Sequence, residues 1–283
     1  MQPIKTSTHA SRKAKILRVD YESLGAFAND CREANVARKY SGAGQSSWWG
    51  GDSIAKLMDK CLAGEDTHIA KAEELLELLR DEIEIPRPQW NPSPYGAFPD
   101  VGAFLAGEVE CMRHIRSDPS MTAPVRVYYD PTSSAAIDSD TLIARGVAAL
   151  ALAMALAQIR PVELWTFSDL DSNGDGLALI CAKIQTNPLM LSEACFALCN
   201  PGYARGLTYG LAEIRMGFQG MWGFGSNEHD QARRTKTMRE ALGADPMDIV
   251  IPGIHSQDEL VKDPVGFIKR ELAKFHVSME EES

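Results

Sequence analysis

The sequence predicts an α/β protein in which a layered sheet carries helices on its faces and a mostly helical region precedes it. Short apolar runs alternate with segments of helical periodicity in the second half of the chain. The first hundred residues hold helical patterns that glycine and proline clusters interrupt. The hydrophobic content of 45% and the charged content of 24% are ordinary for a folded protein, which excludes wholesale disorder.

Composition divides the 283 residues into four segments. Residues 1–18 form a basic arm that has no acidic residue, and such termini are often mobile. Residues 19–99 form the mostly helical region, which ends in a proline-rich connector, and residues 100–277 form the α/β domain. Residues 278–283 form an acidic tip.

The helical region should contain three helices, over Tyr21–Lys39, from Asp52 or Ser53 through Cys61, and over Gly64–Ile83. The run Trp48-Trp49-Gly50-Gly51 precedes the second helix and combines rings with glycines. We interpret its rings as a core anchor in preference to a binding surface. Residues 86–99 hold five prolines and three aromatic residues, which indicates an extended connector or a domain boundary.

The second half should alternate strands with helices. Strands are expected over Val125–Tyr129, Val162–Phe167, Leu177–Ile184 and Asp248–Ile251, and helices over Asp140–Ile159, Leu189–Cys199, Ala204–Met216 and Val265–Val277. The uncharged stretch Gly146–Ile159 is shorter than the about 20 residues that a bilayer span needs, so we expect a helix buried in the core.

Cysteine usage and the N-terminus both indicate a reducing cytoplasm. No CxxC pair occurs, and the first residues lack the apolar stretch of a signal peptide. We therefore expect free thiols, no membrane association and no cofactor. The cysteines are Cys31, Cys61, Cys111, Cys181, Cys195 and Cys199.

A polar run directly follows the strand expected at Val125–Tyr129. Its residues Asp130, Thr132 and Ser134 have the Asp-x-Thr-x-Ser spacing that resembles the metal-ion-dependent adhesion motif of von Willebrand A-type domains. That resemblance implies Mg²⁺ held by a carboxylate and two hydroxyls, with Thr186 and Asp169 as candidates for the later ligands. An ordinary Asp-Pro turn also explains the run.

Other sites are weaker. The run Asp171–Gly176 begins like a calcium loop, but Ala182 stands where the bidentate glutamate belongs, so we expect a hairpin turn instead. No GxSxG, HExxH, Walker A or GxGxxG motif occurs, and the histidines are scattered. The sequence therefore favours a protein that is not an enzyme, although an unrecognised site stays open.

Residues 217–239 combine a glycine-rich loop with a basic helix. The loop carries Trp222 and Phe224, whose rings offer stacking faces to bases, and cations can follow the phosphates. An acidic body with a net charge of -10 can still attract phosphates through such a local patch. The alternative is a loop whose rings are buried beside a solvated helix. The predicted binding residues are Arg12, Lys13, Lys15, Arg18, Trp222, Phe224, Arg233, Arg234, Lys236 and Arg239.

These cues together resemble the Drc-type single-stranded DNA-binding RNA polymerase cofactors of podoviruses. The resemblance is carried by the Trp48–Gly51 run, the Tyr128-Tyr129-Asp130 strand end, the Ala/Leu-rich helix and the Gly/aromatic/Arg loop. It implies sequence-nonspecific binding of single-stranded DNA and contact with a phage RNA polymerase in the host cytoplasm. Coating of a strand also suggests a homo-oligomer. The alternative is an A-domain-like, Mg²⁺-dependent protein-interaction module.

Overall fold

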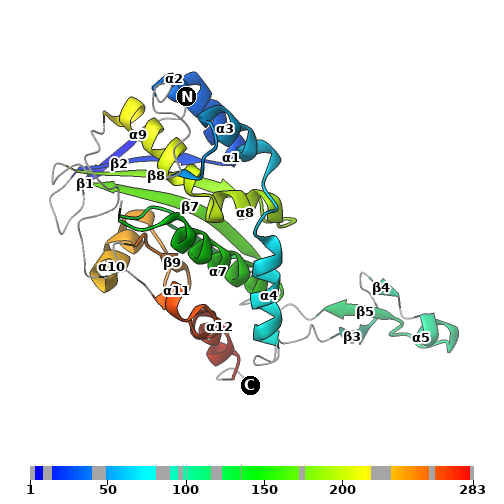
Figure 1. Cartoon of the computed structure of the whole chain (residues 1–283). Coiled ribbons are helices and arrows are strands. Elements are labelled where there is room, and N and C mark those ends of the chain that lie inside the picture. Colours follow the sequence, from blue (N-terminus) through cyan, green and yellow to red (C-terminus); the bar gives the residue numbers. More distant parts are fainter. Residues whose placement is uncertain are drawn as a thin grey trace.

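The chain folds into an α/β body from which a small arm projects (Figure 1). The computed structural model describes residues 4–8, 15–39, 49–80, 90–94, 98–99, 101–115, 123–134, 136–171, 176–217, 231–254 and 259–280. The predicted fold class is confirmed, because the body is built on a mixed sheet flanked by helices.

Six strands form the sheet of the body in the order β1-β2-β8-β7-β6-β9. Their bounds are β1 Lys5–Thr8, β2 Lys15–Tyr21, β8 Gly176–Ile184, β7 Val162–Asp171, β6 Val125–Tyr129 and β9 Ile249–Ile251. Strands β7 and β9 both run parallel to β6, and β2 runs parallel to β8. The pairs β1–β2 and β7–β8 are antiparallel.

The first two strands lie where the sequence predicts a basic arm. Residues of β2 alternate between the two sheet faces, with Val19 and Tyr21 in one core cluster and Ile16 in the other. The charges of Arg18 and Asp20 hide this alternation in the sequence, since the two side chains pair with each other at 2.7 Å. The expected boundary at residue 18 therefore falls inside a strand of the sheet.

One face of the sheet, which we call the inner face, packs against most of the helices. Its strand residues, such as Val127, Leu164 and Ile180, belong to the larger core cluster. The helices that contribute buried residues to this cluster are α1 Leu24–Glu33, α2 Val36–Lys39, α3 Ile54–Ala63, α4 Ile69–Arg80, α7 Ser139–Ala157, α8 Leu191–Cys199, the π-helix η2 Tyr203–Thr208, α9 Tyr209–Met216, α11 Glu259–Lys262 and α12 Pro264–Glu280.

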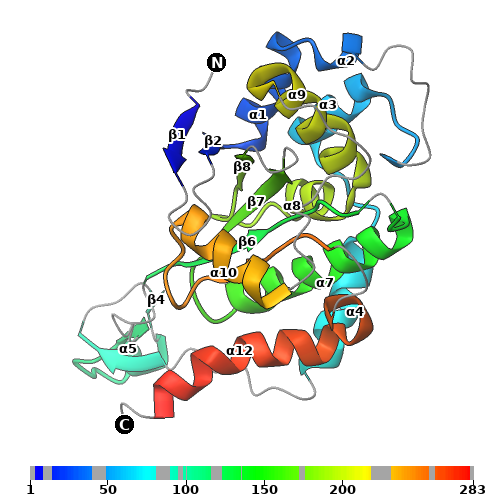
Figure 2. The same cartoon turned by 90° about the vertical axis from the view of Figure 1, so that its left-hand side faces the viewer.

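The opposite, outer face carries a smaller cluster. There Met238 and Leu242 of α10, Gln231–Leu242, pack against Tyr128, Phe167 and Leu179. Figure 2 shows α10 well apart from α1, α3 and α9, which gather at the top of the view. The outer face is thus covered by a basic helix, and this position decides which of its side chains reach solvent.

Helix α7 is the buried helix that the sequence predicts. It is the one helix among the described residues that is long and apolar enough to cross a membrane, and 67% of that apolar window is buried inside the fold. Gly146 permits close packing against α8, because a Cβ at this position would lie 2.2 Å from the carbonyl oxygen of Leu198. Its apolar character on all sides therefore reflects burial in the core.

The N-terminal helices differ from the single helix expected over Tyr21–Lys39. Strand β2 ends at Tyr21, and Ser23 caps α1 by accepting a hydrogen bond from the Ala26 amide at 3.1 Å. Asn35, with a φ of 57°, then separates α1 from α2. Helix α3 begins after Ser53 as predicted, and Ser53 accepts from the Lys56 amide at 3.2 Å.

The projecting arm replaces the expected proline-rich connector. It holds a three-stranded antiparallel sheet in the order β3-β5-β4, with β3 Trp90–Ser93, β5 Met112–Ile115 and β4 Phe98–Pro99. The short helix α5 Val101–Leu105 lies between β4 and β5 in the chain. Pro92 and Pro99 lie on the two outer strands, where a missing N–H interrupts no inner ladder. The domain boundary expected at residue 100 therefore falls within the arm.

Candidate functional site

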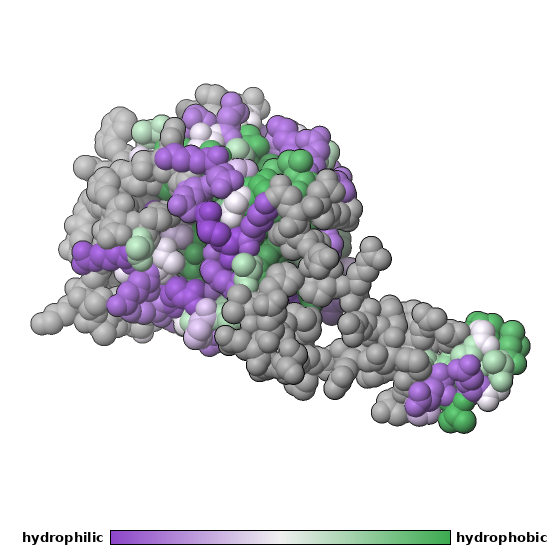
Figure 3. Space-filling view, turned by 90° about the horizontal axis from the view of Figure 1, so that it is seen from below, coloured by the Kyte–Doolittle hydropathy of each residue, from purple (hydrophilic) through white to green (hydrophobic). Residues whose placement is uncertain are grey.

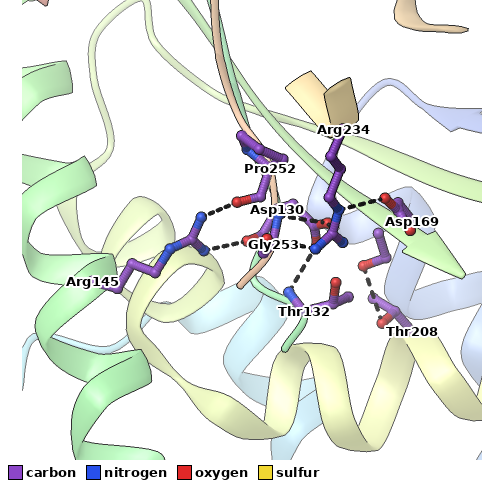
Figure 4. Close-up of polar contacts among 9 residues, drawn as sticks. Asp130, Thr132, Arg145, Asp169, Thr208, Arg234, Pro252 and Gly253 are labelled. Carbon is purple, nitrogen blue, oxygen red and sulfur yellow. Dashed lines mark hydrogen bonds and ion pairs between the residues drawn. The ribbon is translucent and has the colours of Figure 1, made fainter. Parts of the chain in front are cut away.

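The candidate site lies where the carboxyl ends of β6, β7 and β9 meet. Strand β6 lies between β7 and β9 in the sheet. The chain that leaves β6 passes through α7 into β7, and it reaches β9 only after α10. In open α/β sheets this switch in strand order creates the crevice where ligands usually bind. Figure 4 shows the polar residues gathered there.

Asp130 follows β6 and is fully buried. Its Oδ1 accepts from the Thr132 amide at 2.8 Å, and its Oδ2 accepts from the Gly253 amide at 3.0 Å. Gly253 must be glycine to approach this closely, because a Cβ there would lie 2.5 Å from the Thr132 carbonyl oxygen and 2.8 Å from Asp130 Oδ2. The carboxylate thereby ties the loop after β6 to the loop after β9.

Arg234 of α10 supplies the positive charge of the crevice. Its Nη2 lies 3.3 Å from Asp130 Oδ2, and its Nε lies 3.0 Å from Oδ2 of Asp169 on β7. Its Nη1 donates to the Gly253 carbonyl oxygen at 2.6 Å. All three charged side chains are at most 1% exposed, so one guanidinium is shared by two buried carboxylates.

This sharing affects the protonation of Asp130. Burial raises the pKa of Asp130 to about 6; the charge of Arg234 acts in the opposite direction, and the neighbouring Asp169 adds to the rise. The cause is the loss of hydration of a charged carboxylate inside the fold. The guanidinium therefore offsets only part of the desolvation of Asp130.

Two further buried arginines hold the loops around the crevice. Arg145 of α7 donates from Nη1 to the Asp130 carbonyl oxygen at 2.6 Å and from Nη2 to the Pro252 carbonyl oxygen. Arg205 of η2 donates to Ser133 Oγ at 3.1 Å and to the Ile137 carbonyl oxygen at 2.6 Å. These guanidiniums fix the backbone of the loops that follow β6 and β9.

The predicted Mg²⁺ ligands do not form a site that fits the metal. Both oxygens of Asp130 already accept N–H donors, and Arg234 provides the charge that a cation would bring. Ser134 Oγ lies 3.4 Å from the Ala136 amide, while the buried Thr132 Oγ1 has no hydrogen-bond partner. The described residues contain no group of three or more His, Cys, Asp or Glu residues that could hold a metal ion.

The candidates for the later metal ligands, Asp169 and Thr186, lie at opposite ends of the paired strands β7 and β8. Asp169 stands beside Asp130, as the motif requires, but its Oδ2 is held by Arg234. Thr186 follows β8, whose last residue Ile184 pairs with Leu164. Thr186 itself forms an isolated β-bridge with Leu189. Because Asp169 pairs with Leu179, nearer the start of β8, Thr186 lies away from the crevice.

The helix that carries the predicted basic residues presents them on different sides. The inward stripe of α10 consists of Arg234, Met238 and Leu242, which are spaced four residues apart and buried. Arg233 and Lys236 lie on the other side and are exposed. The prediction that Arg234 follows a phosphate is therefore wrong for this structure, since Arg234 is buried against carboxylates.

Two other predicted arginines have structural partners and keep part of their surface in solvent. Arg18 donates from Nη1 to the carbonyl oxygens of Ala241 and Leu242, at 3.0 and 3.1 Å, and so caps the end of α10. Arg239 donates to the carbonyl oxygens of Asp245 and Asp248, the latter at 2.6 Å. Arg18 also pairs with the Asp20 carboxylate at 2.7 Å, which offsets part of its charge, whereas Arg239 is held here by backbone carbonyl oxygens.

The remaining predicted residues fall partly outside the described chain. Lys15 begins β2, and nothing is described of its side chain. The other residues that lie outside the described ranges are Arg12, Lys13, Trp222 and Phe224. Trp48 also lies outside, whereas Trp49 is buried and donates from Nε1 to the Asp52 carbonyl oxygen at 3.1 Å, which fits the predicted core anchor.

Two smaller predictions can be compared with the structure. Strands β7 and β8 pair antiparallel up to Asp171 and Leu177, so the calcium-loop-like run joins a hairpin as expected, although residues 172–175 lie outside the described ranges. All six cysteines are free thiols, as predicted. Helix α12 extends to Glu280, within the segment expected as an acidic tip.

Sequence reasoning missed the Asp130–Arg234–Asp169 cluster as a unit. A usable signal was present. Both aspartates lie at the carboxyl ends of apolar strands, and Arg234 is followed at intervals of four residues by the apolar Met238 and Leu242.

Comparison with curated proteins and with solved structures finds no significant match. A family model does match, over residues 4–278, so the chain belongs to the family described as domain of unknown function DUF7192.

Proposed function

We propose that this chain is a non-enzymatic protein that binds single-stranded DNA without sequence preference. The binding surface, which we call the basic face, consists of β1, β2 and the outward side of α10. Its acidic residues, Asp20 and Glu240, are outnumbered by its cations. The cations are Lys5, Arg18, Arg233, Lys236 and Arg239.

The observation that carries the proposal is that α10 buries one side against the sheet and exposes cations on the other side. The helix is anchored by its inward residues, so that Arg233 and Lys236 are held in solvent on a fixed scaffold. Arg18 joins β2 to the end of α10, and the ion pair of Lys5 with Asp20 at 2.8 Å links β1 to β2. A surface on which cations outnumber acids, on a chain of net charge -10, suits a polyanion such as a nucleic-acid backbone.

The preference for single strands rests on the sequence. Trp222 and Phe224 precede α10 and supply the rings on which unpaired bases stack, each worth about 1–3 kcal/mol per base. The resemblance to Drc-type cofactors gives the proposed setting, the host cytoplasm, where the protein would contact a phage RNA polymerase.

Fluorescence anisotropy with labelled oligo-dT and a duplex of equal length, over a salt series, tests the proposal. We expect tighter binding of oligo-dT, and affinity should fall as salt rises because phosphate contacts release counterions. The pair Arg233→Ala with Lys236→Ala should weaken binding and flatten the salt slope by about 0.7 for each lost contact. Trp222→Ala should weaken binding at every salt concentration with little change of slope.

The matched control removes two exposed cations from another surface. Arg270 and Lys274 lie on α12, so Arg270→Ala with Lys274→Ala changes net charge equally and should leave binding intact. Equal weakening by both pairs would show that only bulk charge matters. Failure of the unaltered protein to bind oligo-dT at low salt would overturn the proposal.

A further inference from the structure

The end of the arm exposes a set of large apolar side chains. We call residues 101–110 the arm tip, and Figure 3 shows its apolar surface standing clear of the body. None of the residues of α5 is buried. The large apolar side chains of the tip are between 61% and 82% exposed, and they are Val101, Phe104, Leu105 and Val109.

Exposed apolar side chains that lie together mark a contact surface. Val101, Phe104 and Leu105 are three and four residues apart on α5, so their side chains share one side of the helix. The arm's sheet is formed by β3, β5 and β4 without them. Their apolar character is therefore explained by a partner and not by the folding of the arm.

The charge of the tip restricts that partner. From Trp90 to Met112 the sequence holds Asp100, Glu108 and Glu110 and no Lys or Arg. Glu108 and Glu110 are both exposed. Like charges repel phosphate groups, which disfavours nucleic acid and anionic lipid, and they also disfavour contact between two identical tips.

The same chain offers a surface of opposite sign. The basic face carries Arg233 and Lys236, and Ile4, directly before β1, adds an apolar side chain that is 39% exposed. We propose that the arm tip of one copy docks on the basic face of a second copy, with its glutamates against the cations. The two surfaces differ, so the contact is head-to-tail and can repeat from copy to copy.

This arrangement links self-association to strand binding, and only that link rests on the proposed function. A phosphate backbone and the glutamates of a neighbouring tip require the same cations of the basic face. Oligo-dT should therefore displace the tip and dissociate the assemblies. Docking itself does not depend on any nucleic acid.

Sedimentation velocity of the full chain tests the docking. The unaltered protein should form species that grow with concentration and shrink as salt rises. The tip variant Phe104→Ser with Leu105→Ser should stay monomeric, and so should the face variant Arg233→Glu with Lys236→Glu. The control variant Arg270→Glu with Lys274→Glu should associate like the unaltered protein.

Mixing the two monomeric variants gives the sharpest result. Each retains the surface that the other has lost, so an equimolar mixture should form a dimer that does not grow further. A mixture that stays monomeric overturns the head-to-tail contact, and so does a face variant that still associates. An unaltered protein that is monomeric at every concentration overturns the docking altogether.

Failure of the docking and failure of the strand binding give different results. A protein that associates but ignores oligo-dT would retain the docking and lose the proposed function. A protein that binds oligo-dT as a monomer would show the reverse. The tip variant should bind oligo-dT at least as tightly as the unaltered protein, because its basic face is intact and unoccupied.

Discussion

The crevice at the strand ends and the tip of the arm differ in where their side chains find partners. In the crevice, two aspartates and three arginines are buried, and they bind one another and the backbone of neighbouring loops. At the tip, four large apolar side chains remain in solvent. The position typical of a ligand site is thus closed by the chain's own groups, and the surfaces open to partners lie elsewhere.

Removing the shared guanidinium should have the largest effect. Arg234→Ala leaves Asp130 and Asp169 buried without a countercharge, and breaking a buried pair in this way costs about 3–5 kcal/mol of unfolding free energy. Urea unfolding measures the loss. The adjacent, exposed Arg233→Ala is the control and should stay within about 0.5 kcal/mol of the unaltered protein. Equal effects would place Arg234 outside the core of the crevice.

The raised pKa of Asp130 predicts a dependence of stability on pH. Its folded pKa of about 6 lies above the ordinary 3.8, so its contribution is fully present below 3.8 and is lost as pH rises through 6. The unfolding free energy of the unaltered protein minus that of Asp130→Asn should therefore fall between pH 4 and 7, by about 3 kcal/mol at most. A difference that stays constant over this range would contradict the assignment.

Filling the space at Gly253 should have an intermediate effect. Gly253→Ala places a methyl group against Thr132 and Asp130, and overpacking of this kind costs about 1–3 kcal/mol. Thermal unfolding measures the change. An unaltered melting temperature would mean that the loops after β6 and β9 can separate without penalty.

The tip should contribute little to folding. Phe104→Ser removes a side chain that is 67% exposed, so the free energy of unfolding should change by no more than about 0.5 kcal/mol. Chemical denaturation of dilute protein gives this value. A large loss would show that the tip packs within its own chain, and the contrast with the crevice would disappear.

Mg²⁺ should have no effect on the crevice. Because N–H donors and Arg234 already satisfy Asp130, we expect no heat of binding in calorimetry and no shift of the melting temperature. Heat that appears in the unaltered protein and vanishes in Asp130→Ala would restore the metal-dependent interpretation of the Asp130–Ser134 run.

Periodicity and apolar runs were sufficient to predict the fold class and the strands from β6 to β9. They did not predict β1 and β2, because Lys5, Arg18 and Asp20 pair across the strands and give the segment the composition of a solvated tail. The arm was missed for a related reason, since prolines on its outer strands imitate a connector.

The site was predicted only in part. Sequence spacing identified Asp130 and named Asp169 as a candidate neighbour, but Arg234 was predicted to be a solvent-exposed residue that binds nucleic acid. Two adjacent arginines, Arg233 and Arg234, look equivalent in a sequence, whereas the helix turns one outward and the other into the crevice. Which one turns inward depends on the docking of α10 on the sheet, and that is a tertiary contact.

Photocrosslinking of a 5-bromouracil-substituted single strand, followed by peptide mapping, tests the central claim most directly. The basic face predicts adducts in peptides that contain residues 5–21 or 231–242, and competition by unlabelled oligo-dT should remove them. Adducts confined to α12 or to the arm, or a complete absence of adducts at low salt, would contradict the claim.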